Sequence, residues 1–181
     1  MLLSIIIAFL IAKHKKLSIT PLFHSYWLLP IALVELIYII FQGAVLFGYY
    51  GFLPYASLLK SASLYVLLFP IQHYKLYKPS LLGSGLIVVG TLMNKIVMHA
   101  NDGLMPVYPT LSTWTGYFDA SPMGVTDSIH CLGSAETNLK ILTDYIDIGF
   151  SILSPGDLLV HSFTIIIVYY TIKQLNQEQF N

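Results

Sequence analysis

Histidine and aspartate side chains occur at both ends of one polar stretch of the chain, residues 101–157. His99 and Asp102 lie where this stretch begins, and Asp157 and His161 lie where it ends. The four-residue spacing of the last two places them on one face of a helix. Imidazole and carboxylate groups together suit general acid–base catalysis, and they also suit a zinc or other transition-metal site.

Other polar groups lie inside the stretch, where His130 and Asp127 are three residues apart. No HExxH or comparable metal motif is present, so we assign no metal ligands and no cofactor. Asp157 has an alternative role as the N-cap of a helix, because it ends the sequence Ser-Pro-Gly-Asp. The residues predicted to bind a ligand are Asn101, Asp102, His130, Asp144, Asp157 and His161.

Charged side chains within apolar segments form a second set of candidates. Each costs about 2.5–3.5 kcal/mol at the bilayer centre unless it is paired or faces a cavity. Glu35 would be held at least cost by Lys60 or Lys95, as a structural ion pair or as part of a proton- or ligand-handling site. The predicted intramembrane polar residues are Glu35, Lys60, Asn94, Lys95 and His99.

The elements that must position these residues are membrane helices. Apolar residues make up 56% of the 181 residues and charged residues only 10%, which excludes an ordinary soluble domain. We predict an all-α fold, a polytopic transmembrane bundle in a single membrane domain. The predicted helices cover residues 1–12, 26–42, 54–72, 81–99 and 157–172, and residues 100–156 form the long loop.

Charge distribution predicts how this bundle is oriented. All nine basic residues are lysines, and seven of the nine carboxylates lie in residues 101–157. The lysines near helix ends on one side are Lys13, Lys15, Lys16, Lys75, Lys78 and Lys173, whereas only Lys140 lies in the long loop. The positive-inside rule therefore predicts an external N-terminus, a cytoplasmic C-terminus and an extracytoplasmic loop.

Within the loop, residues 105–123 contain three prolines and are predicted to be extended coil. Residues 134–150 are predicted to form an amphipathic helix capping the bundle, with Ser134 as its N-cap. Its apolar positions at helical spacing are Leu139, Leu142, Ile146 and Phe150. Cys131 is the only cysteine and is interpreted as a small buried residue, with a nucleophile as the alternative.

The motif order of the loop resembles an uncharacterised bacterial membrane family, a domain of unknown function. The matching positions are Asn101, Gly103, Met105, Pro106 and Val107, then His130, then Thr137, Leu139, Leu142 and Asp144, and finally Ser154, Pro155, Gly156 and Asp157. Asp102 departs from the glycine expected in that family, and the usual arginines of the basic turn are missing. The resemblance implies a fold and a site location but no activity.

These observations favour a small non-enzymatic integral membrane protein whose 101–157 loop binds a small ligand or a membrane-protein partner. The first alternative is a membrane-embedded enzyme that uses His99, His130, Asp157 and His161. A second alternative is a small transporter or proton-handling subunit centred on Glu35 and Lys95, although no internal repeat supports it. The expected partners include the lipid bilayer but no nucleic acid, because no basic patch is present.

Overall fold

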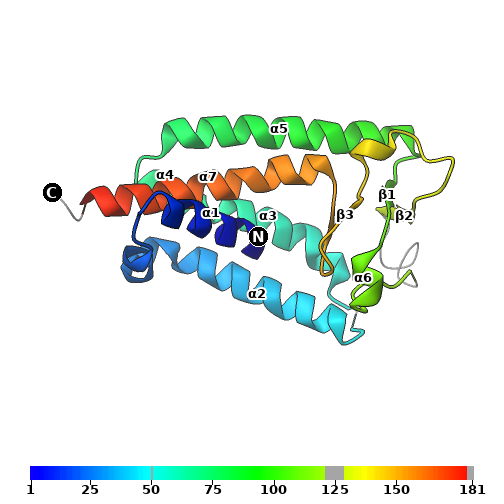
Figure 1. Cartoon of the computed structure of the whole chain (residues 1–181), viewed down its shortest axis with the longest axis horizontal. Helices are drawn as coiled ribbons and strands as arrows, with labels where there is room; N and C mark the ends of the chain where they lie inside the picture. The colour runs from blue at the N-terminus through cyan, green and yellow to red at the C-terminus, as the bar shows by residue number, and fades with distance from the viewer. Residues whose placement is uncertain (50, 121–128, 179–181) are drawn as a thin grey trace. The chain divides into compact units, whose positions relative to one another are not determined.

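A computed structural model describes residues 1–49, 51–120 and 129–178, most of them in helices (Figure 1). The α-helices are α1 (Leu2–His14), α2 (Leu29–Leu46), α3 (Ala56–Tyr65), α4 (Leu68–His73), α5 (Tyr77–Ala100), α6 (Leu111–Trp114) and α7 (Pro155–Glu178). Short 3-10 helices are η1 (Thr20–His24), η2 (Tyr26–Leu28), η3 (Leu53–Tyr55) and η4 (Lys140–Leu142). The strands are β1 (Met105–Val107), β2 (His130–Leu132), β3 (Ile146–Asp147) and β4 (Ile152–Leu153).

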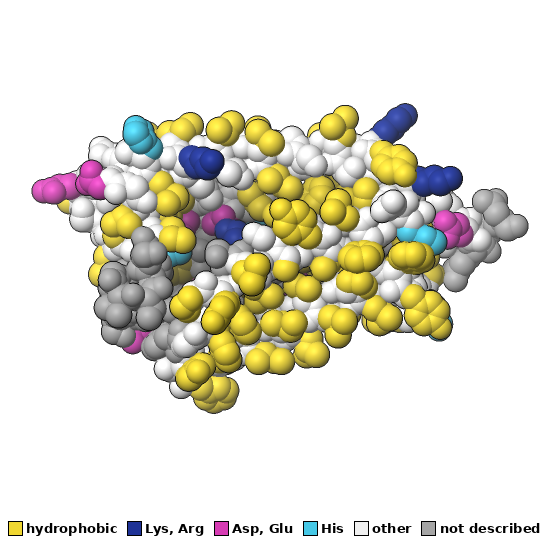
Figure 2. Space-filling model, turned by 180° about the vertical axis from the view of Figure 1, so that it is seen from behind, with side chains coloured by type: hydrophobic (Ala, Val, Ile, Leu, Met, Phe, Trp, Pro, Cys, Tyr) yellow, Lys and Arg dark blue, Asp and Glu magenta, His cyan; other side chains and the backbone are white. Residues whose placement is uncertain are grey.

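In the part of the chain that the structure describes, three helices are long and apolar enough to cross a membrane. They are residues Tyr26–Leu46, which comprise η2 and α2, together with α5 and α7. Each of the last two has 24 residues, about 36 Å at 1.5 Å per residue. Figure 2 shows hydrophobic side chains over much of the face it presents. The prediction of a mostly helical chain with helices able to cross a membrane is confirmed. The apolar helix α1 is shorter.

The continuous helix predicted over residues 54–72 is wrong, because the chain forms α3 and α4 with a break at Val66 and Leu67. Pro70 accounts for the position of the break. Its ring would collide with the carbonyl group four residues earlier, which is that of Val66, and it has no N–H to donate there. The last helix also differs from its predicted end, since α7 continues six residues past residue 172.

The chain divides into two compact units. Unit 1 comprises residues 1–38 and 58–87 and the chain from Val160 onward. Its core includes Ala8 and Ala12 of α1, both fully buried, and Ile167 and Ile172 of α7, also fully buried. The two small alanines fit a helix that is packed closely against its neighbours.

One end of unit 1 is held together by polar contacts between segments far apart in sequence. The Asn176 amide nitrogen donates to the carbonyl of Ser18 at 2.8 Å, and its oxygen accepts the Ser18 N–H at 2.9 Å. The hydroxyl groups of Ser25 and Tyr74 lie 2.6 Å apart. Three segments therefore meet at this end: the turn after α1, the turn after α4 and the C-terminal part of α7. Six of the nine lysines lie in or next to these segments.

Unit 2 comprises residues 39–57 and 88–159 and contains all four strands. Strand β1 pairs in parallel with β2, Met105 opposite His130, and a bridge joins Val107 to Asp144. Strands β3 and β4 form an antiparallel pair. Residues 105–120 therefore contain a strand and the short helix α6 where extended coil is predicted, and residues 121–123 lie outside the described part.

The amphipathic helix predicted over residues 134–150 is wrong. The described chain there has turns, η4 and β3, with Leu139 at a φ of +52°. Its backbone groups bond to distant partners: the Asp144 N–H donates to Pro106, and the Asp144 carbonyl accepts the Tyr108 N–H. These bonds replace the local ones of a helix, and Ser134 caps no helix. Leu139 is 44% exposed and Phe150 is 45% exposed, so the apolar spacing does not mark a buried face.

Gly83 and Gly85 of α5 provide a matched test of packing in unit 1. A Cβ atom at Gly83 would collide with the ring of Phe163, whereas a Cβ atom at Gly85 would meet nothing within 4 Å. We expect Gly83→Ala to lower the free energy of unfolding by about 1–3 kcal/mol. Gly85→Ala should leave it unchanged or raise it slightly, because alanine favours helix. Unfolding of the purified protein in detergent, followed by circular dichroism, measures both, and equal effects would contradict this packing.

Candidate functional site

The C-terminal end of α5 is closed by two asparagines. The Asn101 amide nitrogen donates to the carbonyls of Val97 and Asn138, at 2.9 and 3.1 Å, and its oxygen accepts the Asn138 N–H at 2.9 Å. Asn138 in turn donates to the carbonyl of Ala100. Carbonyl groups in the last turn of a helix have no partner within it, so these bonds satisfy them. Asn101 therefore has a structural role.

Asp102 lies in the sharp turn that follows α5. Its φ is +54° and that of Gly103 is +84°. The Gly103 N–H donates to the carbonyl of Met98 at 2.8 Å, as in the turns that commonly end helices. Aspartate is one of the few residues other than glycine that adopts this conformation readily. The turn that the family resemblance associates with glycine is therefore formed with aspartate in its place.

The start of α7 is a capping box made by Ser154 and Asp157. The Ser154 hydroxyl accepts the Asp157 N–H at 2.9 Å, and the Asp157 carboxylate accepts the Ser154 N–H at 3.3 Å. Pro155 occupies the first helical position, where its missing N–H costs nothing. The prediction of Asp157 as the N-cap is therefore wrong by three residues. Ser154 is the N-cap, and Asp157 is the third residue of the helix.

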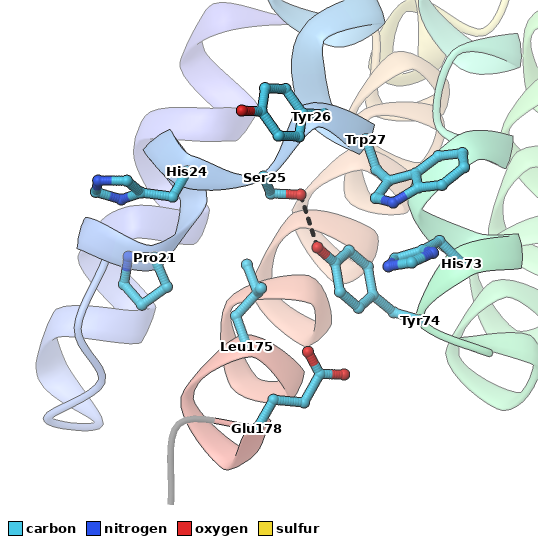
Figure 3. A pocket seen from close by; sticks show the side chains of 9 residues that line it. All are labelled: Pro21, His24, Ser25, Tyr26, Trp27, His73, Tyr74, Leu175 and Glu178. Carbon is cyan, nitrogen blue, oxygen red and sulfur yellow. Dashed lines mark hydrogen bonds between the residues drawn. The ribbon is translucent and has the colours of Figure 1, made fainter.

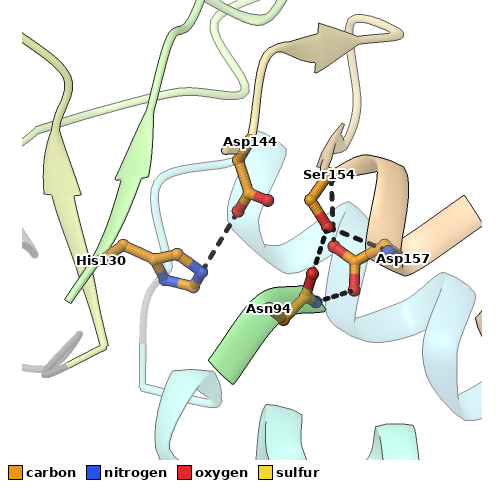
Figure 4. A network of polar contacts seen from close by, with 5 residues as sticks. All are labelled: Asn94, His130, Asp144, Ser154 and Asp157. Carbon is orange, nitrogen blue, oxygen red and sulfur yellow. Dashed lines mark hydrogen bonds and ion pairs between the residues drawn. The ribbon is translucent and has the colours of Figure 1, made fainter. Parts of the chain in front are cut away.

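Asn94 of α5 joins this capping box (Figure 4). Its amide nitrogen donates to the Asp157 carboxylate at 3.1 Å, and its oxygen accepts the Ser154 hydroxyl at 2.9 Å. Gly156 permits the contact, because a Cβ atom there would lie 2.6 Å from the carbonyl oxygen of Gly90 and would overlap the Asn94 side chain. The predicted intramembrane Asn94 is therefore a partner of the loop's last carboxylate.

His130 and Asp144 form the second polar group of the site (Figure 4). The His130 Nε2 atom lies 3.6 Å from the Asp144 Oδ2 atom, which is an electrostatic contact rather than a hydrogen bond. The imidazole side chain is 36% exposed and the carboxylate only 6%. Because β1 pairs with His130 through Met105 and with Asp144 through Val107, this strand brings together two residues that lie 14 positions apart.

The other predicted site residues are placed elsewhere. His99 and Lys95 are exposed on α5, and His161 lies one turn beyond Asp157 in the part of α7 that belongs to unit 1. Asp127 lies outside the described residues. Among residues 1–49, 51–120 and 129–178, no group of three or more His, Cys, Asp or Glu side chains could hold a metal ion.

Glu35 is buried in α2, with 6% of the residue exposed. Its Oε1 atom lies 4.0 Å from the amino group of Met1, which is the ion pair that the structure shows for this carboxylate. Of the two lysines predicted as partners, Lys60 is exposed on α3, and Lys95 belongs to unit 2. The contact that the structure shows is therefore with the Met1 amino group, whereas the sequence predicts Lys60 or Lys95 as the partner of Glu35.

Asp147 is a carboxylate whose role the sequence does not reveal. Its Oδ2 atom accepts the N–H groups of Thr110 and Ser112, at 2.6 and 2.9 Å, and the Ser112 hydroxyl at 2.7 Å. Its Oδ1 atom accepts the N–H of Gly149. Desolvation raises the pKa of Asp147, but these bonds outweigh it and lower the pKa to about 2. Thr110 and Ser112 lie 37 and 35 residues from Asp147, so no local pattern indicates them.

Cys131 follows His130 in β2 and is partly buried. Burial raises the pKa of its thiol above the ordinary value. A thiol held in its protonated form is a poor nucleophile. This favours the small buried residue over the alternative of a nucleophile.

Comparison with known proteins gives a family but no activity. A family model described as "Family of unknown function (DUF5317)" matches residues 19–169. No curated protein and no solved structure matches the chain. The resemblance to a family of unknown function is confirmed at that level.

Replacing Asp147 tests its role in holding α6. We expect Asp147→Ala to lower the free energy of unfolding by about 1–2 kcal/mol at neutral pH, because several donors lose their acceptor. The pKa of Asp147 is about 2 in the folded protein and 3.8 ordinarily. The contribution of Asp147 to the free energy of unfolding is therefore complete above pH 3.8 and is lost as the pH falls toward 2. The gap between wild type and variant should shrink over that window. Glu136→Ala, at an exposed carboxylate of the same unit, should show no such gap.

Gly156→Ala tests the contact between Asn94 and the capping box. The new methyl group would press on the backbone of Gly90, which cannot rotate away. We expect a loss of about 1–3 kcal/mol in the free energy of unfolding. Gly43→Ala in α2 is the matched control, since a Cβ atom there meets nothing within 4 Å. A Gly156→Ala protein as stable as the control would refute the close approach of the two helices.

Proposed function

We propose that this chain, which belongs to the Family of unknown function (DUF5317), is a small integral membrane protein that binds a ligand through residues 101–157. The observation that supports this function is the His130–Asp144 pair. A buried carboxylate lies behind a partly exposed imidazole, so a ligand can reach the ring while the ionic contact holds its orientation.

The proposed topology places this segment outside the cytoplasm. The lysine-bearing turns after α1 and α4 meet the end of α7 at one end of unit 1, through the Ser18–Asn176 and Ser25–Tyr74 contacts. Their clustering supports a cytoplasmic location for that end and for the C-terminus. In this topology α3 and α4 together make one crossing as a broken helix, and the apolar spans of α2, α5 and α7 make the others. Helix α1 enters the bilayer without crossing it, because its Met1 amino group contacts Glu35 in the middle of α2.

The charge of the segment indicates the kind of ligand. Residues 101–157 carry seven carboxylates and one lysine. Three of these carboxylates have structural roles: Asp102 in the turn after α5, Asp147 in capping α6 and Asp157 at the start of α7. Their charges still contribute to the local field. A cationic small molecule or a basic segment of a membrane-protein partner fits this field, whereas an anion would be repelled.

The proposal is tested by the melting temperature of the purified protein in detergent, with spermidine as the cationic probe and glutamate as the anionic one. Spermidine should raise the melting temperature by mass action, and glutamate should not. Asp144→Asn and His130→Gln should reduce the spermidine effect.

His99→Gln is the matched control, because this exposed histidine of the same unit should leave the effect unchanged. Circular dichroism confirms that each variant is folded. A spermidine effect that is equal in wild type and in all three variants would show that the His130–Asp144 pair is not the binding site. The absence of any spermidine effect would contradict the cationic ligand.

A further inference from the structure

A cleft of about 400 Å³ lies at the lysine-rich end of unit 1 (Figure 3). Its walls come from η1 and η2, from the residues after α4 and from the last turns of α7. The lining residues are Pro21, His24, Ser25, Tyr26, Trp27, His73, Tyr74, Leu175 and Glu178. Its size falls within the range of small-molecule sites, about 300–1,000 Å³. None of these residues belongs to the site proposed above, which lies in unit 2.

The cleft lies at the level of the lipid headgroups. Tyr26 and Trp27 begin one of the three apolar spans, and Glu178 ends another. The two ends of membrane-spanning helices mark the boundary between hydrocarbon and water, where Tyr and Trp rings are enriched. Tyr26 is 83% exposed and Trp27 is 45% exposed, which leaves their rings accessible to a lipid.

The lining favours a cationic group. Among the described residues that line it, Glu178 is the one carboxylate and there is no lysine. One carboxylate oxygen accepts the Gln174 amide at 3.4 Å, and a carboxylate can accept several hydrogen bonds at once. Tyr26 is exposed and offers a ring face to which an ammonium group is attracted, whereas Tyr74 is buried in the wall of the cleft. Trp27 is stacked on His73, with ring centroids 4.4 Å apart, so these two side chains form a fixed wall.

We propose that this cleft binds the ammonium group of a zwitterionic phospholipid headgroup, with phosphatidylethanolamine as the simplest lipid of that chemistry. Glu178 accepts hydrogen bonds from the ammonium group, and the Tyr26 ring face contacts the same ammonium group. The lysines near this end repel a free cation but are neutralised by the phosphate of the same headgroup. The zwitterion therefore fits both the carboxylate of the cleft and the positive charge around it.

Native mass spectrometry of the full-length protein in detergent tests this proposal. Phosphatidylethanolamine and phosphatidylglycerol with identical acyl chains are added separately, and the bound fraction is measured. Wild type should bind phosphatidylethanolamine more tightly. Glu178→Gln should lower that affinity about two- to fivefold, the effect expected of one exposed charge. Tyr26→Leu should weaken it in the same direction, because the ring is lost.

Matched controls are Glu136→Gln, an exposed carboxylate of unit 2, and Tyr65→Leu, an exposed tyrosine of unit 1 outside the cleft. Neither should change the affinity. Tighter binding of phosphatidylglycerol that increases in Glu178→Gln would show that the cleft recognises phosphate, and would overturn the proposal. An unchanged phosphatidylethanolamine affinity in Glu178→Gln would overturn it too.

The source of the ammonium group is tested by competition. Free phosphoethanolamine, added at the concentration of the lipid, should displace little of it, because the acyl chains hold the lipid at the site. Complete displacement would show that the cleft binds a soluble amine and that the lipid is not its ligand.

Discussion

The start of α7 is the interaction on which the rest of unit 2 depends. The first N–H groups of a helix have no partner within it, and here the Ser154 hydroxyl and the Asp157 carboxylate satisfy donors reciprocally. The same carboxylate accepts the Asn94 amide, so one group both ends the loop and fixes it to α5. That contact links the last residue of the segment 101–157 to the helix from which the segment starts.

This constraint separates the carboxylates of the segment by role. Asp157 uses one oxygen for the Asn94 amide and the other for the Ser154 N–H. Asp147 accepts the N–H and hydroxyl groups of both Thr110 and Ser112 and the N–H of Gly149. Groups so fully engaged hold structure. Asp144 is in ionic contact with an imidazole that water can reach. That contact is the reason for proposing His130 and Asp144 as the place where a ligand binds.

The sequence predicts the three long apolar helices well and the loop poorly, and the reason is physical. Long apolar runs such as α5 satisfy their backbone locally, so composition and length are enough to identify them. Residues 134–150 have helical apolar spacing, but their N–H and carbonyl groups bond to Asn101, Pro106 and Tyr108 instead. Such partners are set by the fold, and no local pattern shows them. The break at Val66 is an intermediate case, because Pro70 is visible in the sequence but its effect on a membrane helix depends on the surroundings.

The candidate residues illustrate the same difference. The motif Ser-Pro-Gly-Asp identifies Asp157 as part of a helix start, because a capping box is a local motif. The motif alone does not show that Ser154, and not Asp157, is the N-cap. Its pairing with Asn94, 63 residues earlier, required the two helices to be adjacent. His130 and Asp144 are each visible as ionisable groups, yet only the pairing of both with β1 makes them neighbours. A small parallel strand pair thus places an imidazole over a buried carboxylate, an arrangement that neither residue's immediate sequence could specify.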